Sequence, residues 1–373
     1  MTDGPAFDVD FLVVGGGPAG SACAIRLAQA GARVAIVESS DFSRFRIGET
    51  LEPSLGPALA HLGVELEEQN WSAACRGITA TWGQSTAARR PTIFNAYGKG
   101  WCVDRRKFDR ALFDQARRAG AIALSMTRVT SAHRQNGRWV CELRTEQEAV
   151  PVAATWLVAA TGRAGKLPFA VNSSRAWIDR LVGAAVVDND QRNDHHGMAG
   201  EPIVEAASSG WWYCTSLPDG SRVAIFFTDA DILPKGNARR AAFLLDQHKH
   251  SPQINAAWPF ITALIEQHRW TGFDARSSIS RIAASDGWVA VGDALMAFDP
   301  LCGRGVTEAV ASGCEVASWL LQPSSPAPDR GELPGWVRKA ADRFNRYRQQ
   351  RRQIYAREMR WPQSTFWRRR HLS

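Results

Sequence analysis

The chain has 373 residues and a net charge of +8, with 45 Lys and Arg against 37 Asp and Glu, and 45% of its residues are hydrophobic. This length exceeds one small core and predicts two domains, while the apolar content excludes a disordered or low-complexity protein. We expect neither a membrane span nor a secretory signal, because no apolar run approaches about 18 residues and acidic residues precede the first one.

The cysteines and histidines bear on redox state and on metals. The seven cysteines are odd in number, scattered and free of CxxC spacing, which predicts reduced thiols in a cytoplasmic protein without a zinc or iron–sulfur site. His195 and His196 are adjacent, but neighbouring side chains of an extended loop point apart and no third ligand is near. We therefore expect no metal.

The first predicted elements are a strand, a glycine turn and a helix. The apolar run 9–14 predicts a strand of a parallel sheet that is covered on both faces. In the GxGxxG turn that follows, the glycines permit a tight turn, approach of a pyrophosphate, and close packing of the next helix. The helix predicted over 21–31 directs its unpaired N–H groups at the phosphates. We expect cofactor contacts from Gly15, Gly17, Pro18, Ala19 and Gly20.

A second strand completes this unit and carries an acidic residue at its end. The strand is predicted over 33–37 and ends at Glu38, which lies 18 residues after Gly20. A carboxylate at this place accepts both hydroxyls of an adenosine ribose and repels a 2′-phosphate. The unit therefore predicts FAD or NAD rather than NADP.

A charged loop over 42–57 comes next. Arg44, Arg46 and Glu49 lie in this loop beside the predicted nucleotide site, where arginines could hold a pyrophosphate and position the reactive ring. Glu49 could orient that ring or the substrate, and we take it as the candidate catalytic residue. The alternative is a loop carboxylate paired with Arg44 or Arg46.

The remaining elements alternate between this nucleotide-binding unit and a second domain. Strands ending at Gly162 and at Gly292-Asp293 return to the first sheet, where ligands bind at the carboxyl ends of strands. In the first half of the chain we further predict a helix over 55–63, alternating strands over 76–101, and a helix capped by Asp104. A meander over 129–150 with a turn at Asn136-Gly137 and a buried strand over 156–160 follow. The second half predicts an antiparallel sheet with helices on one side over 174–270, a glycine-rich turn at 299–306 leading into a helix, and a terminal helix from 336 to about 360.

The order of these motifs resembles a family of flavoproteins. The motifs are GxGxxG with a distant Glu, the GET loop, an Arg-x-x-Phe-Asp helix, Thr-Gly-Arg, and a strand followed by GD-x6-PLCGRG. They are similar to the family that joins aromatic hydroxylases of the p-hydroxybenzoate hydroxylase fold, flavin-dependent halogenases and geranylgeranyl reductases. The resemblance implies an α/β fold: a Rossmann-like FAD-binding domain, a smaller antiparallel-sheet substrate domain and a C-terminal helix.

The order of the predicted elements gives the domain boundaries, and the resemblance implies further cofactor contacts. The FAD-binding domain would comprise 1–75, 102–173 and 276–322, the substrate domain 76–101 and 174–275, and the linker with its basic helix 323–373. The second turn would lie at the isoalloxazine ring, where a helix N-terminus steadies negative charge. Besides Glu38 and the first turn, the implied FAD contacts are Arg46, Arg105, Gly162, Gly292, Asp293, Pro300, Gly303, Arg304 and Gly305.

A narrower resemblance rests on residues 210–218, 227–231 and 360–370. These segments are similar to LodB/GoxB/QhpG-like flavoproteins, which serve the biogenesis of tryptophan-derived quinone cofactors in partner amine or amino-acid oxidases. This implies a monooxygenase that uses reduced FAD and O₂ to hydroxylate a tryptophan of a protein or peptide, such as an oxidase precursor. Electrons would come from NAD(P)H or a reductase. Trp211 and Tyr213 could wall the substrate pocket, and core packing is the alternative.

Other functions stay open at this point. The chain could hydroxylate a small aromatic metabolite, or act as a flavin-bearing maturation partner of an oxidase. Halogenation is disfavoured, because halogenases take up hypohalous acid on a lysine beyond the GET loop, and the first lysine here is Lys99. A guanidinium stays protonated and cannot replace that amine. An isoprenoid reductase would need a long apolar tunnel, which the Trp- and Arg-rich second domain does not suggest.

The C-terminal segment concentrates arginine. Asp342 and Glu358 are the acids of this segment, so the excess charge predicts a face that steers an acidic protein partner. The alternatives are a solvated helix face, or arginines that fold back and brace the two domains. We expect no nucleic-acid partner. The arginines are Arg346, Arg348, Arg351, Arg352, Arg357, Arg360, Arg368, Arg369 and Arg370.

Overall fold

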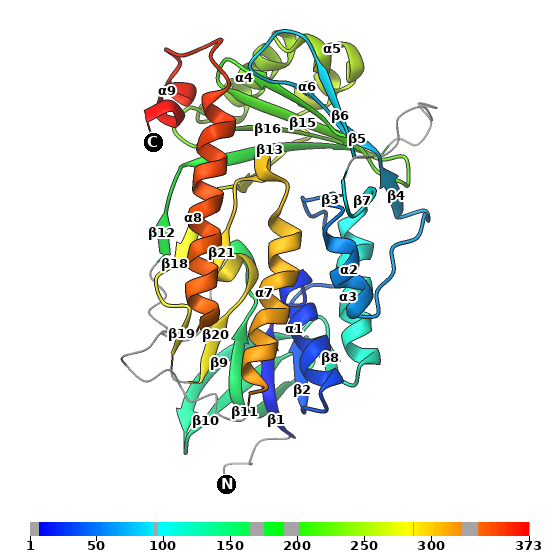
Figure 1. The fold of residues 1–373 in the computed structure, drawn as a ribbon, viewed down its shortest axis with the longest axis vertical. Helices are drawn as coiled ribbons and strands as arrows, with labels where there is room; N and C mark the ends of the chain where they lie inside the picture. Colours follow the sequence, from blue (N-terminus) through cyan, green and yellow to red (C-terminus); the bar gives the residue numbers. More distant parts are fainter. Residues whose placement is uncertain are drawn as a thin grey trace.

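The computed structural model describes residues 7–92, 95–164, 175–189, 201–285, 287–322 and 335–372. The adjacent pair His195 and His196 and the linker over 323–334 lie outside these residues. In the part described, two large sheets occupy opposite ends of an elongated molecule, and two small sheets lie between them (Figure 1).

The sheet nearer the N-terminus contains the predicted nucleotide-binding unit. Its order is β19-β20-β11-β1-β2-β8, and β10 and β9 continue from β11. The pairings of β1 with β2 and β11, of β11 with β20, and of β2 with β8 are parallel, as predicted. The strands are β1 (Phe7–Val14), β2 (Val34–Val37), β8 (Ile122–Leu124), β9 (Arg128–Gln135), β10 (Arg138–Arg144), β11 (Ala149–Ala159), β19 (Ala284–Ser285) and β20 (Trp288–Ala290).

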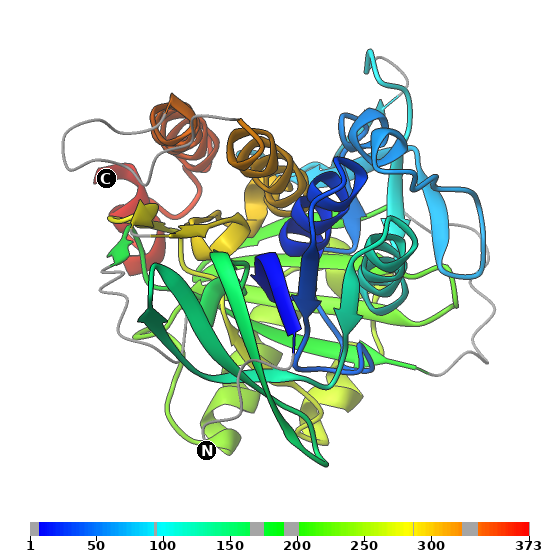
Figure 2. The same ribbon diagram turned by 90° about the horizontal axis from the view of Figure 1, so that it is seen from below.

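Three helices cover one face of this sheet, and the β9–β10 hairpin curls beneath the other (Figure 2). They are α1 (Pro18–Gln29), α3 (Arg105–Arg118) and α7 (Gly305–Leu320), and α1 contacts both others. The contact with α7 is close, because a Cβ added at Gly313 would stand only 2.3 Å from the carbonyl oxygen of Ala19. The first turn of α1 is therefore fixed between the sheet and α7.

The β9–β11 meander follows the prediction with one difference. Asn136 and Gly137 have φ of 51° and 77°, the left-handed conformation that a two-residue hairpin turn requires. The strand predicted separately over 156–160 is the second half of β11, which runs on from the meander without a break. The buried runs 152–154 and 157–159 of β11 are separated by the exposed Thr155, so the sequence suggested two strands.

The second large sheet has the order β17-β13-β16-β15-β14-β5-β6. Its pairings are antiparallel except for β5 with β14, which is parallel. Helices α4, α5 and α6 pack on one face, as predicted, and the other face looks toward the first domain (Figure 1). The elements are β5 (Gly77–Thr81), β6 (Ala88–Pro91), β13 (Leu181–Asp188), β14 (Ile203–Ala207), β15 (Gly210–Ser216), β16 (Arg222–Asp229), β17 (Thr271–Asp274), α4 (Asn237–Lys249), α5 (Pro252–Ala257) and α6 (Ile261–Glu266).

Short elements connect the two domains. One small sheet has the order β3-β7-β4 and the other β12-β18-β21. Helix α2 and three 3-10 turns complete this region. The elements are β3 (Thr50–Leu51), β4 (Ser72–Cys75), β7 (Gly100–Val103), β12 (Arg175–Trp177), β18 (Ser278–Ser280), β21 (Met296–Ala297), α2 (Leu55–His61), η2 (Gly162–Ala164), η3 (Gly292–Ala294) and η4 (Pro300–Cys302).

The C-terminal segment forms two helices rather than the single helix predicted over 336–360. Helix α8 (Gly335–Ala356) runs along the molecule from the first sheet to the second, where α9 (Thr365–Leu372) lies against the second sheet (Figure 1). The chain turns at Glu358, whose carboxylate accepts hydrogen bonds from the backbone N–H of Gly83 and of Arg360. Pro362 follows, and proline cannot continue a helix. No helix in the described ranges combines the length and the apolar character that crossing a bilayer requires.

Candidate functional site

The first glycine turn contains two tightly packed glycines and one glycine with free space around it. Gly15 has φ of 113°, and a Cβ there would stand 2.2 Å from the carbonyl oxygen of Ala160. A Cβ at Gly20 would stand 2.0 Å from the carbonyl oxygen of Gly15. At Gly17 the nearest atom is Nη1 of Arg46, 3.9 Å away. The turn is thus tightly built, with free space at the glycine expected to meet a pyrophosphate.

The N-terminus of α1 is available to an anion. Gly17 is its N-cap, Pro18 begins the helix, and no side chain caps it. Pro18, Ala19 and Gly20 are buried in the first turn, so the orientation of the following N–H groups is fixed by packing. Uncapped N–H groups at a fixed helix start favour a phosphate.

Glu38 lies beside this turn, at the end of β2. Its Oε2 accepts a hydrogen bond from the N–H of Gly16 at 2.8 Å, and its Oε1 accepts one from the hydroxyl of Ser40 at 2.7 Å. The guanidinium of Arg46 reaches the same group, with Nη2 3.4 Å from Oε1. The structure therefore brings together the turn, Glu38 and Arg46, three of the predicted contacts.

The aspartate of the Arg-x-x-Phe-Asp motif, to which the sequence analysis gave no role, holds both predicted arginines. Asp109 is fully buried and accepts two hydrogen bonds from Arg105, at 2.9 and 3.0 Å. Arg46 contacts the same carboxylate at 3.1 Å, and Arg105 also donates to the carbonyl of Ile47 at 2.6 Å. The spacing of Arg105 and Asp109, four residues apart on one helix, was the available signal. Asp104 caps this helix through the N–H of Arg106, as predicted.

Gly292 and Asp293 lie next to the start of α1. Gly292 has φ of 59°, and a Cβ there would stand 2.6 Å from the Cβ of Ala19. The carboxylate of Asp293 is 3.2 Å from Nε of Arg163. Arg163 also donates to the carbonyl of Phe298 at 2.6 Å. The Gly162-Arg163 turn and the Asp293 turn thus meet at the same edge of the first sheet.

The second glycine-rich turn is open on the side of its glycines. Pro300 lies in η4, Gly303 has φ of 65°, and Gly305 begins α7. No heavy atom lies within 4 Å of a Cβ added at Gly303 or Gly305. The N–H groups of Leu301, Cys302 and Gly303 already donate within the turn, so the uncapped N–H groups at the start of α7 are the ones available to a ligand.

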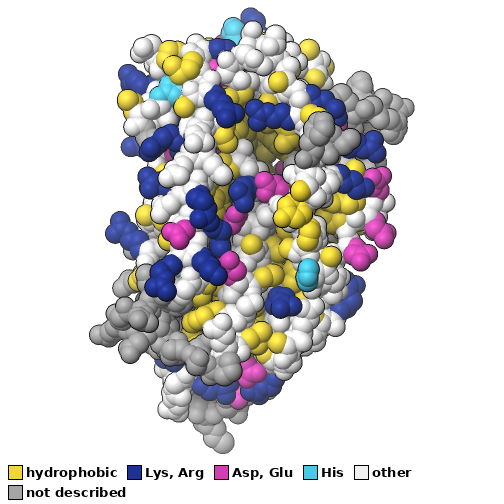
Figure 3. Space-filling model, in the orientation of Figure 1, with side chains coloured by type: hydrophobic (Ala, Val, Ile, Leu, Met, Phe, Trp, Pro, Cys, Tyr) yellow, Lys and Arg dark blue, Asp and Glu magenta, His cyan; other side chains and the backbone are white. Residues whose placement is uncertain are grey.

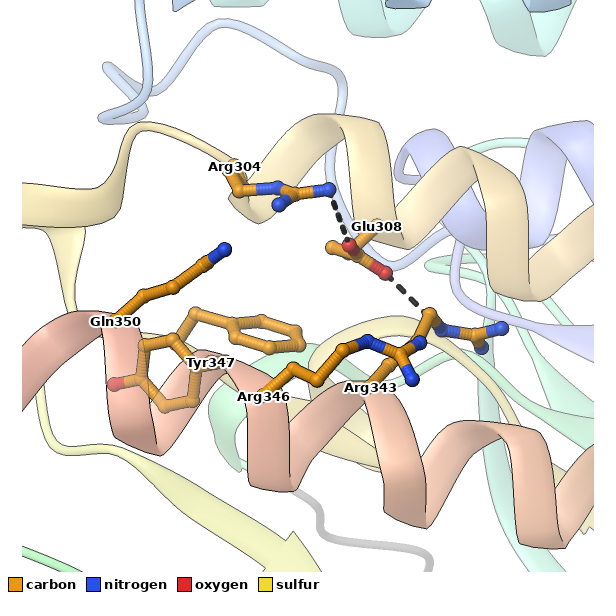
Figure 4. A pocket seen from close by; sticks show the side chains of 7 residues that line it. Arg304, Glu308, Arg343, Arg346, Tyr347 and Gln350 are labelled. Atoms are coloured by element: carbon orange, nitrogen blue, oxygen red, sulfur yellow. Dashed lines mark ion pairs between the residues drawn. The ribbon is translucent and has the colours of Figure 1, made fainter.

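The side chain of Arg304 forms ion pairs with two carboxylates. Its guanidinium is 3.2 Å from Glu308 and 3.8 Å from Glu52. Figure 4 shows Arg304 and Gln350 above Tyr347, at a cavity of about 110 Å³ between α7 and α8. A larger cavity of about 790 Å³ lies by β13 and β17, and none of the predicted site residues lines it. The side chain of Arg304 is held by carboxylates, so its backbone is the part that borders the open turn.

Glu49 is a buried carboxyl group with one free oxygen. It is 1% exposed, its Oε2 accepts a hydrogen bond from the N–H of Gly48, and its Oε1 has no hydrogen-bond partner among the described residues. Burial raises the pKa of Glu49 to about 7, against smaller lowerings by the backbone N–H groups of Glu49 and Gly48 and by Arg105. Within the described residues it pairs with neither Arg44 nor Arg46, so the alternative of a loop ion pair is wrong.

The second domain contributes a tyrosine next to Glu49. The hydroxyl of Tyr213 on β15 is hydrogen-bonded to that of Thr50 at 2.8 Å, so β15 and the GET loop meet here. Trp211 is 1% exposed, stacks on Phe227 with ring centroids 4.1 Å apart, and donates its indole N–H to Tyr355. Trp211 thus packs as the core alternative described, whereas Tyr213 is half-buried at the junction.

Near this junction the surface is hollowed. Figure 3 shows a depression between the second sheet and the N-terminal end of α7, with hydrophobic side chains inside it and Lys and Arg side chains on the neighbouring helix α8. Both the second glycine-rich turn and β15 belong to elements that meet there (Figure 1). An isoalloxazine ring bound at the second glycine-rich turn would face the second domain.

The arginines of the C-terminal segment divide into two groups. Arg351, Arg360, Arg369 and Arg370 fold inward and pair with Asp299, Glu358, Asp231 and Asp229. Arg351, Arg369 and Arg370 pair with acids distant in sequence, so these three fold back as the bracing alternative expected, and a purely basic outer face was wrong for them. Arg360 pairs within the segment, with an acid two residues away. The other five are exposed, namely Arg346, Arg348, Arg352, Arg357 and Arg368.

These observations fit FAD. The starts of α1 and α7 have no side-chain cap, open glycines border both, and an acidic residue follows β2. The model of the FAD-binding domain family matches residues 8–330. The chain belongs to this family of FAD-binding domains. It is an FAD-dependent oxidoreductase, and in the described part of the chain no three His, Cys, Asp or Glu side chains gather to hold a metal ion.

Known proteins of this family cover several activities. The chain is 28% identical to LodB of Marinomonas mediterranea, named an FAD-dependent oxidoreductase, over 97% of this chain and 96% of LodB. It is 26% identical to the flavin-dependent halogenase armH4 of Armillaria mellea, over 82% of this chain and only 64% of that protein.

Solved structures show the same fold. The peptidyl tryptophan dihydroxylase QhpG, essential for tryptophylquinone cofactor biogenesis, superposes with a TM-score of 0.78 at 24% identity, over 97% of this chain and 78% of QhpG. The myxobacterial chondrochloren halogenase CndH superposes with a TM-score of 0.74 at 22% identity, over 97% of this chain and 86% of that chain. The mixed α/β flavoprotein fold predicted from the sequence is confirmed.

Proposed function

We propose that this protein is an FAD-dependent monooxygenase that hydroxylates a tryptophan of a partner protein during the biogenesis of a quinone cofactor. The observation that carries the proposal is Glu49, a buried carboxyl group with a free oxygen at the junction of the two domains. The full-length similarity to LodB and the fold shared with QhpG, a peptidyl tryptophan dihydroxylase, support this substrate class.

The residues of the first domain bind and orient the cofactor in this proposal. The amides of the first turn and of α1 hold the pyrophosphate, and Glu38 holds the ribose. Arg105 fixes the GET loop through the carbonyl of Ile47. The uncapped N–H groups at the start of α7 would face the isoalloxazine ring of bound FAD and would stabilise negative charge on it. When bound, reduced FAD supplies the activation of O₂ for insertion of oxygen into an aromatic ring.

Glu49 moves a proton at its Oε1 atom. A carboxyl group with a pKa of about 7 is half-ionised near neutral pH and can accept the proton that leaves the aromatic carbon on hydroxylation. Tyr213, bonded to Thr50 at the same junction, orients the indole. The role of Trp211 is to support Tyr213 from the core behind it.

The same region does not favour halogenation. Lys99 pairs with Glu68 at 3.0 Å, and both side chains are exposed. No lysine of the described residues lies at Glu49 or Tyr213, because the other four described lysines belong to α3, α4, α8 and the segment just before α4. Uptake of hypohalous acid would lack its amine here.

The experiment offers the reduced protein three substrates in the presence of O₂ and chloride. These are a peptide with one internal tryptophan, free tryptophan, and the peptide with phenylalanine in place of tryptophan, with NADH, NADPH or dithionite as electron donor. We expect a mass gain of one or two oxygen atoms in the tryptophan peptide alone. Oxidation of free tryptophan without oxidation of the peptide, or a chlorinated product, would refute the proposal. We expect the reaction to take place in the cytoplasm.

A further inference from the structure

Asp299, the residue before the second glycine-rich turn, forms hydrogen bonds with three side chains of α8. Its carboxylate is 1% exposed. Oδ2 accepts hydrogen bonds from Nε of Arg351 and from the hydroxyl of Tyr355, both at 2.9 Å. Its backbone N–H donates to the hydroxyl of Tyr347 at 2.8 Å. All three partners project from one face of α8.

The same carboxylate shapes the turn. Oδ1 accepts a hydrogen bond from the N–H of Leu301 at 3.0 Å and so caps η4. Gly303 and Gly305, further along, have no atoms packed where a side chain would begin. Because no side chains pack against the outer side of the turn, the position of the turn depends on Asp299, the residue that precedes it.

Charge balance at Asp299 depends on Arg351. Arg351 is 7% exposed and also lies 3.2 Å from the carboxylate of Asp179. Two buried carboxylates therefore share one guanidinium. Burial and the proximity of Asp299 raise the pKa of Asp179, against a lowering by Arg351. Without Arg351, negative charge next to the turn would be uncompensated.

One hydroxyl joins this cluster to the second domain. Tyr355 accepts a hydrogen bond from the indole N–H of Trp211 at 3.1 Å while it donates to Asp299. Burial raises the pKa of Tyr355 well above its ordinary value, so its proton stays in place as a donor. The wall of the second sheet and the second turn are thus linked through a single atom of α8.

We propose that Arg351 and Tyr355 of α8 are positioning residues of the flavin site, which fix the second glycine-rich turn through Asp299 and neutralise that carboxylate. The C-terminal helix then takes part in setting the reduction potential of FAD. Negative charge that develops on the ring during reduction is opposed by a nearby unpaired carboxylate and tolerated when Arg351 neutralises it. This role needs bound FAD only and is independent of the identity of the substrate.

The test is the reduction potential of bound FAD in purified variants. Arg351→Met should lower the equilibrium constant for two-electron reduction at least tenfold, a shift of about 30 mV to more negative potential. Tyr355→Phe, which removes a single donor, should shift it about threefold in the same direction. Arg351→Lys should recover most of the loss. The double variant Asp299→Asn with Arg351→Met should also recover most of it, because the carboxylate at the base of the turn loses its charge together with its partner, while Asp179 alone stays without Arg351.

Arg369→Met is the matched control, since Arg369 of α9 pairs with Asp229 and Asp231, away from the turn. Its potential should equal that of the wild type. The visible spectrum of bound FAD gives a second readout of the turn. If Arg351→Met does not fold, Tyr355→Phe and the double variant decide. Potentials equal to the wild type in Arg351→Met and Tyr355→Phe, or an equal shift in Arg369→Met, would overturn the proposal and leave α8 as a brace.

Discussion

Replacing Glu49 by glutamine should make the protein more stable above neutral pH. The carboxyl group is fully buried, and burial raises its pKa from an ordinary value of 4.5 to about 7. Between these two values the folded protein binds the proton that the unfolded chain has released, so stability decreases as the pH rises through this window. The full loss, present above pH 7, is about 3 kcal/mol.

Glutamine removes this loss because it mimics the protonated group. Its carbonyl oxygen can accept the hydrogen bond from the N–H of Gly48 that Oε2 accepts now, while its amide nitrogen takes the place of the unpartnered Oε1. At pH 5 the variant and the wild type should therefore have similar free energies of unfolding. At pH 8 the variant should be more stable by up to about 3 kcal/mol.

The assay is urea unfolding of the apoprotein at half-unit steps from pH 5 to pH 8.5, because bound FAD would add its own charges. Glu65→Gln, an exposed change of the same chemistry, is the control and should follow the wild type. A difference between Glu49→Gln and the wild type that does not change with pH would refute the reasoning. In the FAD-bound protein we expect Glu49→Gln to lower the hydroxylation rate and to remove the pH dependence near 7.

Three further predictions follow from the described contacts. Gly17→Val should abolish the yellow colour of bound FAD while circular dichroism stays native, because only Arg46 lies near the added atoms; retained FAD would contradict the proposed pyrophosphate site. Arg370→Met should lower the free energy of unfolding by about 1.5–3 kcal/mol, because Asp229 loses the buried hydrogen bonds of Arg370 but keeps its ion pair with Arg369. Exposed Arg368→Met should change it by less than about 0.5 kcal/mol; equal effects in urea unfolding would contradict this. Reversing Arg346, Arg348 and Arg352 to Glu should weaken binding of a fluorescent glutamate-rich tryptophan peptide about tenfold at low salt and much less at moderate salt. The same charge reversal at Arg128, Arg239 and Lys249 is the control and should leave binding unchanged. An equal loss of binding in both triple variants would argue against a specific surface.

Elements set by local pattern were predictable from the sequence. The β1-turn-α1-β2 unit, the Asn136-Gly137 hairpin and the cap at Asp104 depend on residues that are close in the chain, and the structure contains all three. Helix α1 spans Pro18–Gln29 rather than the predicted 21–31. The open Gly17 beside packed Gly15 and Gly20 also follows from the motif. Local chemistry was enough for each of these features.

Contacts between distant segments were not predictable in the same way. Arg351 lies 52 residues from Asp299 and Arg370 lies 141 residues from Asp229, so no spacing rule could match these arginines with their acids. The prediction that the C-terminal arginines form an exposed basic face was therefore wrong for Arg351 and Arg370. The burial of Glu49 likewise depends on how the loop meets β15, which a single sequence does not encode locally.

The central claim is that oxygen from O₂ enters a tryptophan held in a polypeptide. Its most direct test is a reaction of the reduced FAD-bound protein with a tryptophan-containing peptide under isotopically labelled O₂ in ordinary water, with tandem mass spectrometry of the product. The account predicts the label on the indole ring of the tryptophan, and a strong decrease in Glu49→Gln. Product oxygen that comes from water, or label on a residue other than tryptophan, would contradict it.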